Sequence, residues 1–242
     1  MRSSAKILLA ALALVWANAA NAVPIASRAA LQTLLGGPGT VEDFEAFSIA
    51  PGSQTSVLCD TDTLHDAATT LDAASVCNKV LGAQGPGLVK PGIALIKAAG
   101  DSVYFQWNGA GYFGSPSKEF LVNTPPLIID FTTAVGAFGL DLRAFAGYGA
   151  SATMVVLGSD DFTVIGTISG IALGSGDPPV FAGWEDAGGI GSISLTQLGQ
   201  SWSPIVDNVE WGNPGAVPVP GSLALLGLGL AGLGFSRRKR AS

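Results

Sequence analysis

We predict a mainly β protein that folds as a single β-sandwich or jelly-roll domain. Segments in which apolar residues alternate or run together, such as Phe138–Phe145 and Phe162–Ile168, recur through residues 23–212. Clusters of Gly, Pro, Asn and Asp separate these segments, and the chain contains 33 Gly and 14 Pro. Short strands about 8–12 residues apart, with turns of this composition, are typical of sandwiches and jelly rolls.

Nine segments have the length and the pattern of β-strands. Two of the turns expected between them are Gly158–Asp161 and Ala187–Gly191, where Gly and acidic residues gather. The predicted strands are Ile93–Lys97, Val103–Trp107, Leu127–Phe131, Ala137–Phe145, Thr153–Leu157, Phe162–Ser169, Val180–Trp184, Ile190–Leu195 and Ile205–Trp211.

One segment has a helical pattern instead. Apolar residues at spacings of three and four between Leu64 and Leu81 predict one short amphipathic helix near residues 63–80. The two cysteines, Cys59 and Cys77, lie just before this segment and near its end. Two cysteines of an exported protein most often form a disulfide, so we expect one here. The rival is a metal site, for which His65 is the one available histidine.

The charges divide the chain into three regions. Of the 12 Lys and Arg residues, two lie near the N-terminus and four near the C-terminus, which leaves six for residues 23–221. All 18 acidic residues lie in that middle region. Basic residues so few and so scattered exclude a nucleic-acid-binding surface.

The N-terminus has the pattern of a secretory signal peptide. Arg2 and Lys6 precede the uncharged run Ile7–Ala17, and Ala20-Asn21-Ala22 is a small-x-small cleavage site. The apolar run is shorter than the roughly 20 residues that a membrane span requires. We therefore expect signal peptidase to recognise Ala20 and Ala22 and to remove residues 1–22. Residues 23–212 are then expected to form the exported domain.

The C-terminus contains three features in a fixed order. Val217-Pro218-Val219-Pro220 is followed by the uncharged run Leu223–Phe235 and then by Arg237-Arg238-Lys239-Arg240. Residues 213–221 are therefore predicted to be a Pro/Gly linker, and residues 222–242 a short transmembrane helix with a basic tail. Positive charge after a span holds that end in the cytoplasm, which leaves the domain outside.

This order of features resembles the PEP-CTERM sorting signal of exported bacterial proteins. Val219 stands where that family has the Glu that gives it its name. The resemblance implies that an exosortase recognises the tail and removes it, after a first stage in which the tail tethers the domain to the inner membrane. It also implies a protein of the cell surface or the extracellular biofilm matrix, in bacteria that make exopolysaccharide.

The predicted domain lacks the motifs of common hydrolases. The one histidine, His65, has no accompanying nucleophile or zinc motif. Acidic pairs such as Asp160-Asp161 and Glu185-Asp186 are adjacent, and neighbours on a strand point to opposite faces. We therefore expect no enzyme activity and no cofactor, and a glycoside hydrolase is the least favoured function. The leading hypothesis is a non-catalytic surface protein associated with exopolysaccharide.

A carbohydrate-binding module is the alternative. The core is loosely similar to lectin-like jelly rolls, in which the first and last strands lie together. Glu42 and Asp43 would then approach Asp207 and Asn208, and oxygen ligands of this kind suit Ca²⁺. Two tryptophans at strand ends, which fit core positions equally well, would stack on sugar rings. They are Trp107 and Trp184.

Overall fold

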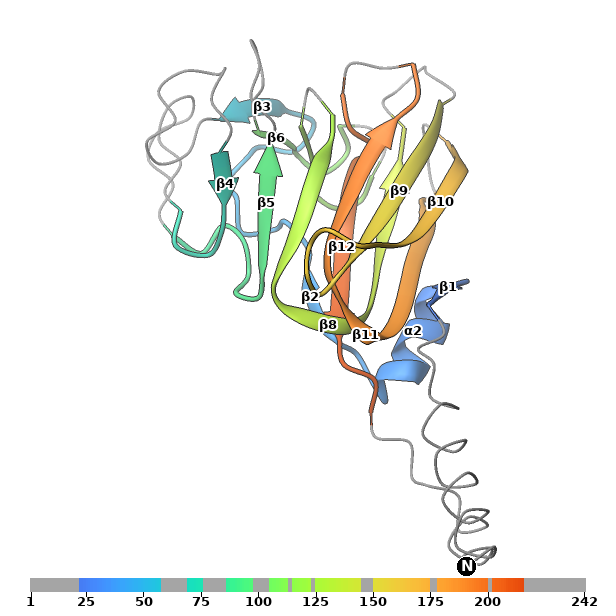
Figure 1. The fold of residues 1–242 in the computed structure, drawn as a ribbon. Coiled ribbons are helices and arrows are strands. Elements are labelled where there is room, and N and C mark those ends of the chain that lie inside the picture. Colours follow the sequence, from blue (N-terminus) through green and yellow to red (C-terminus); the bar gives the residue numbers. More distant parts are fainter. Residues whose placement is uncertain are drawn as a thin grey trace, which may run out of the picture.

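The structure is a computed structural model that describes residues 22–57, 69–75, 86–97, 105–112, 115–122, 125–144, 150–174, 178–199 and 202–215. These residues form one helix and a set of antiparallel strands consistent with the predicted β-sandwich (Figure 1). The helix is α2 (Arg28–Leu35). The strands are β1 (Val23–Ile25), β2 (Thr40–Glu42), β3 (Gln54–Val57), β4 (Thr69–Leu71), β5 (Ile93–Lys97), β6 (Phe105–Asn108), β7 (Glu119–Val122), β8 (Leu127–Arg143), β9 (Ala150–Gly158), β10 (Val164–Leu173), β11 (Val180–Gln197) and β12 (Ile205–Gly212).

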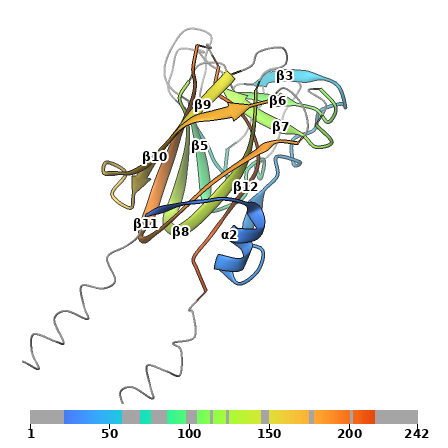
Figure 2. The same ribbon diagram turned by 90° about the vertical axis from the view of Figure 1, so that its right-hand side faces the viewer.

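The two longest strands, β8 and β11, belong to both layers of the sandwich. They pair with each other from Leu127↔Leu195 to Leu142↔Val180. The first half of β8 also pairs with β5, and its second half pairs with β12. The second half of β11 pairs with β9, and its first half pairs with β1. Both strands therefore pass from one layer into the other, and their bend lies next to α2 (Figure 2).

The bend shows that the turn predicted at residues 187–191 is wrong. The chain continues through these residues as one strand, with register shifts between Glu185 and Ile190 and again before Ser192. Gly189 has a φ of 92°, and a Cβ at Gly191 would lie 2.2 Å from Asp161 Oδ1. The glycines thus serve a β-bulge and a close chain approach, because a bulge needs the same conformational freedom as a turn.

The turn predicted at Gly158–Asp161 is confirmed. It connects β9 to β10, and the Gly158 amide donates to the Thr163 carbonyl across it. The Asp160 carboxylate accepts hydrogen bonds from the amides of Phe162 and Thr163 at 3.0 and 2.8 Å. An aspartate that accepts from the residues after it in the chain is a common way to fix such a turn.

The helix predicted near residues 63–80 is wrong over the part that the structure describes. Thr69–Leu71 form β4, which pairs with β5, and the Leu71 side chain is fully buried. The Asp72 side chain then accepts from the Ala74 amide and the Ser75 hydroxyl, which makes a turn. The β-branched Thr69-Thr70 favours a strand, and burial of Leu71 outweighed the helical spacing.

The helix that does form, α2, was not predicted. The Ser27 side chain caps its first turn by accepting from the Ala30 amide, and Gly36 ends it with a φ of 77°. Leu31 is its fully buried residue. A Cβ at Gly139 of β8 would lie 3.0 Å from Leu31 Cδ2, so the absent side chain lets α2 approach the sheet. The caps Ser27 and Gly36 were the available evidence in the sequence.

Large side chains fill the space between the two layers. Trp184 on β11 reaches across to β10, where a Cβ at Gly166 would lie 2.1 Å from its ring. Phe131 and Phe138, from the two halves of β8, have ring centroids 5.7 Å apart. A glycine opposite a tryptophan is therefore required by the thickness of this core.

Several predicted features lie outside the described residues. They are residues 1–21 of the signal peptide, the cysteines Cys59 and Cys77 with His65, and the tail from residue 216 onward. Ala22, the last residue of the predicted cleavage site, is the first described residue and packs against the core. In the part of the chain that the structure describes, no helix has the length and apolar character to cross a membrane.

The contact between Gly166 and Trp184 predicts a local limit on side-chain size. Gly166→Ala should lower the free energy of unfolding by about 2 kcal/mol, because the new methyl group overpacks the core. Gly174→Ala is the control, since nothing lies within 4 Å of its Cβ position. Urea unfolding of both variants measures the difference. Equal midpoints would contradict this account of the core.

Candidate functional site

A network of charged residues lies where α2 meets β8 and β12. Arg28 on α2 donates from Nη1 to Glu210 Oε2 at 2.8 Å and from Nη2 to the Asn208 carbonyl at 2.8 Å. Its Nη2 also lies 3.1 Å from Asp141 Oδ1. The guanidinium is 5.4 Å from the centroid of the Phe181 ring. We call these residues the Arg28 network.

Glu210 is the buried centre of the Arg28 network. Its side chain has no exposed surface, and it accepts hydrogen bonds from Gln32 Nε2 and from the Gly39 amide. A buried carboxylate needs such a set of donors, because its desolvation is otherwise costly. Glu210 therefore joins α2 and the segment before β2 to the last strand.

A β-bulge in β12 produces this arrangement. Asp207 pairs with Asp141, whereas Glu210 pairs with Gly139, so one additional residue is inserted on β12. The bulged Asn208 has a φ of 48°. The insertion turns Asp207 and Glu210 to one face, while Val206 and Val209 both face the core.

Asp207 lies beside the Arg28 network in a buried position. It accepts hydrogen bonds from the Ser117 hydroxyl and the Asn208 amide. Burial raises the pKa of Asp207 to about 6, although these two hydrogen bonds act in the opposite direction. Nearby, Arg143 Nε lies 2.8 Å from Glu119 Oε1 in a buried ion pair. On this face, Arg28 and Arg143 are thus paired with buried carboxylates, and Asp207 accepts hydrogen bonds from Ser117 and Asn208.

The four residues predicted as calcium ligands are not gathered into one site. The predicted pairing itself is present, because Glu42 on β2 lies opposite Val209 on β12. However, Glu42 accepts from the amides of Phe44 and Lys90, and burial raises its pKa. Asp43 pairs at the surface with Lys90, 3.6 Å away. No three His, Cys, Asp or Glu residues of the described chain are placed to hold a metal ion.

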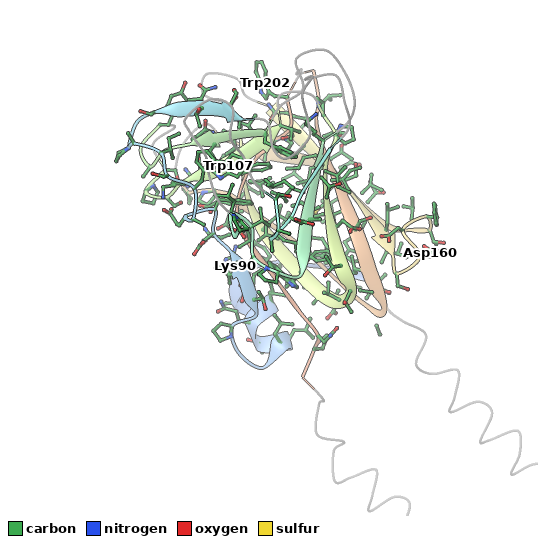
Figure 3. The ribbon with its side chains drawn as sticks, turned by 90° about the vertical axis from the view of Figure 1, so that its left-hand side faces the viewer. Lys90, Trp107, Asp160 and Trp202 are labelled. Carbon is green, nitrogen blue, oxygen red and sulfur yellow. The ribbon has the colours of Figure 1, made fainter. Side chains whose placement is uncertain are left out.

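The tryptophans predicted to stack on sugars are core residues. Trp107 is fully buried and stacks on Phe47 with ring centroids 4.5 Å apart. Trp184 is 6% exposed and covers Gly166. Figure 3 shows Trp107 within the domain. This burial contradicts the predicted stacking role, because neither ring has a free face.

An exposed aromatic residue occurs elsewhere, at the β9–β10 turn. The Phe162 side chain is 88% exposed. Beside this turn is a shallow groove of about 220 Å³, whose lining contains Asp160, Thr163 and Asp186. Figure 3 shows Asp160 where the turn projects from the side of the domain. The sequence contained one indication of this surface, an aromatic residue between polar residues directly after a predicted turn, although Phe162 was predicted to begin a strand.

The end of the domain is held against α2 and the bend. After β12, Asn213 Oδ1 accepts from the Gly136 amide at 2.8 Å. Pro214 packs on Gly136, where a Cβ would lie 2.4 Å from its Cδ atom. The Gly215 amide donates to the Leu34 carbonyl at 3.3 Å. The chain therefore leaves the domain from a defined point.

Comparison with known proteins identifies the segment that begins directly after Gly215. Residues 216–239 match the family model of the PEP-CTERM protein-sorting motif, which confirms the resemblance of the tail. The chain carries a PEP-CTERM sorting motif, and this motif directs exosortase-dependent sorting from the C-terminus. It implies an exported, cell-surface protein. No curated protein matches the chain.

The raised pKa of Asp207 predicts a pH-dependent stability. The folded protein binds this proton more tightly than the unfolded chain, whose pKa is near 3.8. The resulting stabilisation is complete below about pH 4 and is lost as the pH rises through 6. The contribution of Asp207 is measured as the free energy of unfolding of the unchanged protein minus that of Asp207→Asn. This difference should fall by about 2–3 kcal/mol between pH 4 and pH 8.

Urea unfolding at the two pH values measures this difference. Ser117→Ala gives a second test, because it removes a hydrogen bond that favours the charged carboxylate. That variant should lose more stability than the unchanged protein over the same pH range. If the difference in the free energy of unfolding between the unchanged protein and Asp207→Asn does not change with pH, the raised pKa of Asp207 is refuted.

Proposed function

We propose that this chain is a non-catalytic protein of the cell surface or extracellular matrix that associates with exopolysaccharide. The observation that carries the proposal is the PEP-CTERM motif at residues 216–239. Motifs of this kind belong to a sorting route, so the function of the chain depends on where its domain is delivered. Association with exopolysaccharide is inferred from the setting in which such proteins occur.

We infer a route with two processing steps. Signal peptidase removes the N-terminal residues, and the C-terminal tail then tethers the domain to the inner membrane, outside the cytoplasm. An exosortase next processes the tail. The position of Gly215, held by Leu34 immediately before the motif begins, supports a domain that stands close to the membrane at that stage.

The absence of catalysis is supported by how the described charges are used. Arg28 and Arg143 form ion pairs with buried carboxylates, and Glu42 and Asp207 accept hydrogen bonds from neighbouring amides. Such groups stabilise the fold, because their charges and hydrogen bonds are used within it. A matrix protein requires a stable domain more than a reactive one.

A carbohydrate-binding module is the second candidate function. One observation favours it, which is the exposed Phe162 ring beside a polar groove. Aromatic faces pack well on the apolar faces of pyranose rings, and polar groups orient the hydroxyls. This candidate adds a specific contact to the proposed association with polysaccharide.

Deletion of the tail tests the sorting step. A chain lacking residues 216–242 should be exported yet fail to remain at the cell surface, because it has no tether. Fractionation of producing cells, with immunoblotting of each fraction, measures the distribution. The full chain in exosortase-deficient cells is the control, and it should accumulate unprocessed in the membrane fraction. Normal processing in those cells would contradict the proposed route.

Val219 predicts how efficiently the tail is processed. Val219→Glu introduces the residue that gives the family its name, so conversion to the processed form should become faster. Val217→Glu places the same charge two residues earlier and should not accelerate processing. A pulse-chase experiment measures both rates. Equal acceleration by the two variants would mean that added charge, and not the sorting motif, governs the rate.

A further inference from the structure

We propose that the groove beside the β9–β10 turn, with the ring of Phe162, binds an uncharged pyranose unit of a glycan. This groove is lined by Gly158, Ser159, Asp160, Thr163, Ile165, Asp186, Gly188 and Gly189. The inference rests on the second candidate function, since it gives that function a location and a class of ligand. Three features support it: an exposed aromatic residue on an ordered turn, an unpartnered carboxylate and the charge of the surroundings.

The turn holds Phe162 in an exposed position. Asp160 Oδ1 accepts from the Phe162 and Thr163 amides, and its Oδ2 accepts from the Thr163 hydroxyl at 2.6 Å. These hydrogen bonds lower the pKa of Asp160 to about 2, so the turn stays intact at any physiological pH. The backbone of the turn is therefore ordered before a ligand arrives, and binding has to order only the Phe162 side chain, which is 88% exposed.

Asp186 provides a buried acceptor in the groove. Its residue is 6% exposed, and within the described chain no hydrogen bond or ion pair reaches its carboxylate. A Cβ at Gly188 would lie 2.8 Å from Asp186 Oδ2, so glycine leaves that oxygen uncovered. The carboxylate is thus accessible from the groove, where hydroxyl groups of a ligand could donate to it.

The size and the charge of the groove define the ligand class. Its volume of about 220 Å³ suits one ring of a chain more than an extended ligand. Asp160 and Asp186 line the groove, and Asp161 lies on the β9–β10 turn beside it. Within the described chain, none of these three carboxylates forms an ion pair. Burial raises the pKa of Asp130, and the negative charge of Asp161 adds to the effect. An anionic glycan would be repelled, whereas a neutral polyol would not.

The apolar face of a pyranose explains the position of Phe162. Phe162 lies on the same turn as two of the lining residues, Asp160 and Thr163, so the proposal places its ring against a ligand that extends beyond the lining of the groove. The C–H groups of a sugar pack on an aromatic face while hydroxyls point sideways toward acceptors. Phe162, Asp186 and Thr163 thus match the two kinds of surface that one sugar ring presents.

Affinity electrophoresis of the full chain tests the site. The chain is solubilised in a polyoxyethylene detergent, because glycoside detergents would compete for the groove. Native gels contain dextran or galactomannan as neutral probes, or polygalacturonate as an anionic one. Neutral polymers should retard the unchanged chain, and polygalacturonate should not. Phe162→Ala should weaken the retardation by about fivefold to tenfold, as expected for the loss of one stacked ring.

Two further variants separate binding from folding. Gly188→Ala should also weaken binding, because its methyl group covers Asp186 Oδ2. Leu198→Ala is the matched control, since Leu198 is 77% exposed on another turn and its loss should leave retardation unchanged. Thermal unfolding confirms that each variant is folded. Equal retardation of Phe162→Ala and the unchanged chain would overturn the site but leave carbohydrate binding itself intact.

The remaining outcomes identify which step fails. Retardation by polygalacturonate alone would overturn the neutral ligand class. The groove would instead be a cation site under two conditions. Ca²⁺ would stabilise the unchanged chain but not Gly188→Ala, and no neutral polymer would retard the chain. No retardation by any polymer would overturn the second candidate function as well. Surface retention and exosortase processing, measured separately, would still report on the sorting route.

Discussion

The pairing of β8 with β11 is the constraint on which the rest of the structure depends. Both strands cross from one layer of the sandwich to the other, and β1, β5, β9 and β12 each pair with one half of them. The bend requires glycines on β11, and it brings the β9–β10 turn against Gly191. The groove at that turn exists because the shared strands bend there. Layer spacing, corner and candidate binding surface therefore have one physical origin.

A second constraint operates on the outer face of β12. Its bulge brings Asp207 and Glu210 to the same side, where Arg28 compensates the buried charge of Glu210. Ion pairs of this kind contribute modestly to net stability, yet breaking one leaves an unpaired buried charge. The Arg28 network thus selects the position of α2 more than it strengthens the fold. Because α2 also holds Gly215, the same network determines where the chain leaves the domain.

The sequence predicted a strand well where a short apolar run is buried, and poorly where glycines could form either a turn or a bulge. Ile93–Lys97 matches β5, and the confirmed Gly158–Asp161 turn closes a hairpin. At residues 187–191 the same kind of composition forms a bulge, and only the long-range pairing of β8 and β11 distinguishes the two. The tail was recognisable because its three features are local in sequence. The binding surface was not, because the burial of Trp107 and Trp184 and the exposure of Phe162 depend on how the layers pack.

The hydrogen bond between Gly215 and Leu34 also sets a length scale for processing. The sorting motif begins one residue later, and the apolar segment begins within a few residues more. Even a fully extended chain from residue 216 to residue 222 would span no more than about 25 Å. In the proposed route, in which the apolar segment tethers the domain to the inner membrane, an enzyme that acts on this stretch would have to fit between the folded domain and the lipid surface. Under that proposal, the folded domain would limit which enzymes can reach the stretch, because an enzyme too large for the space would be excluded by its size.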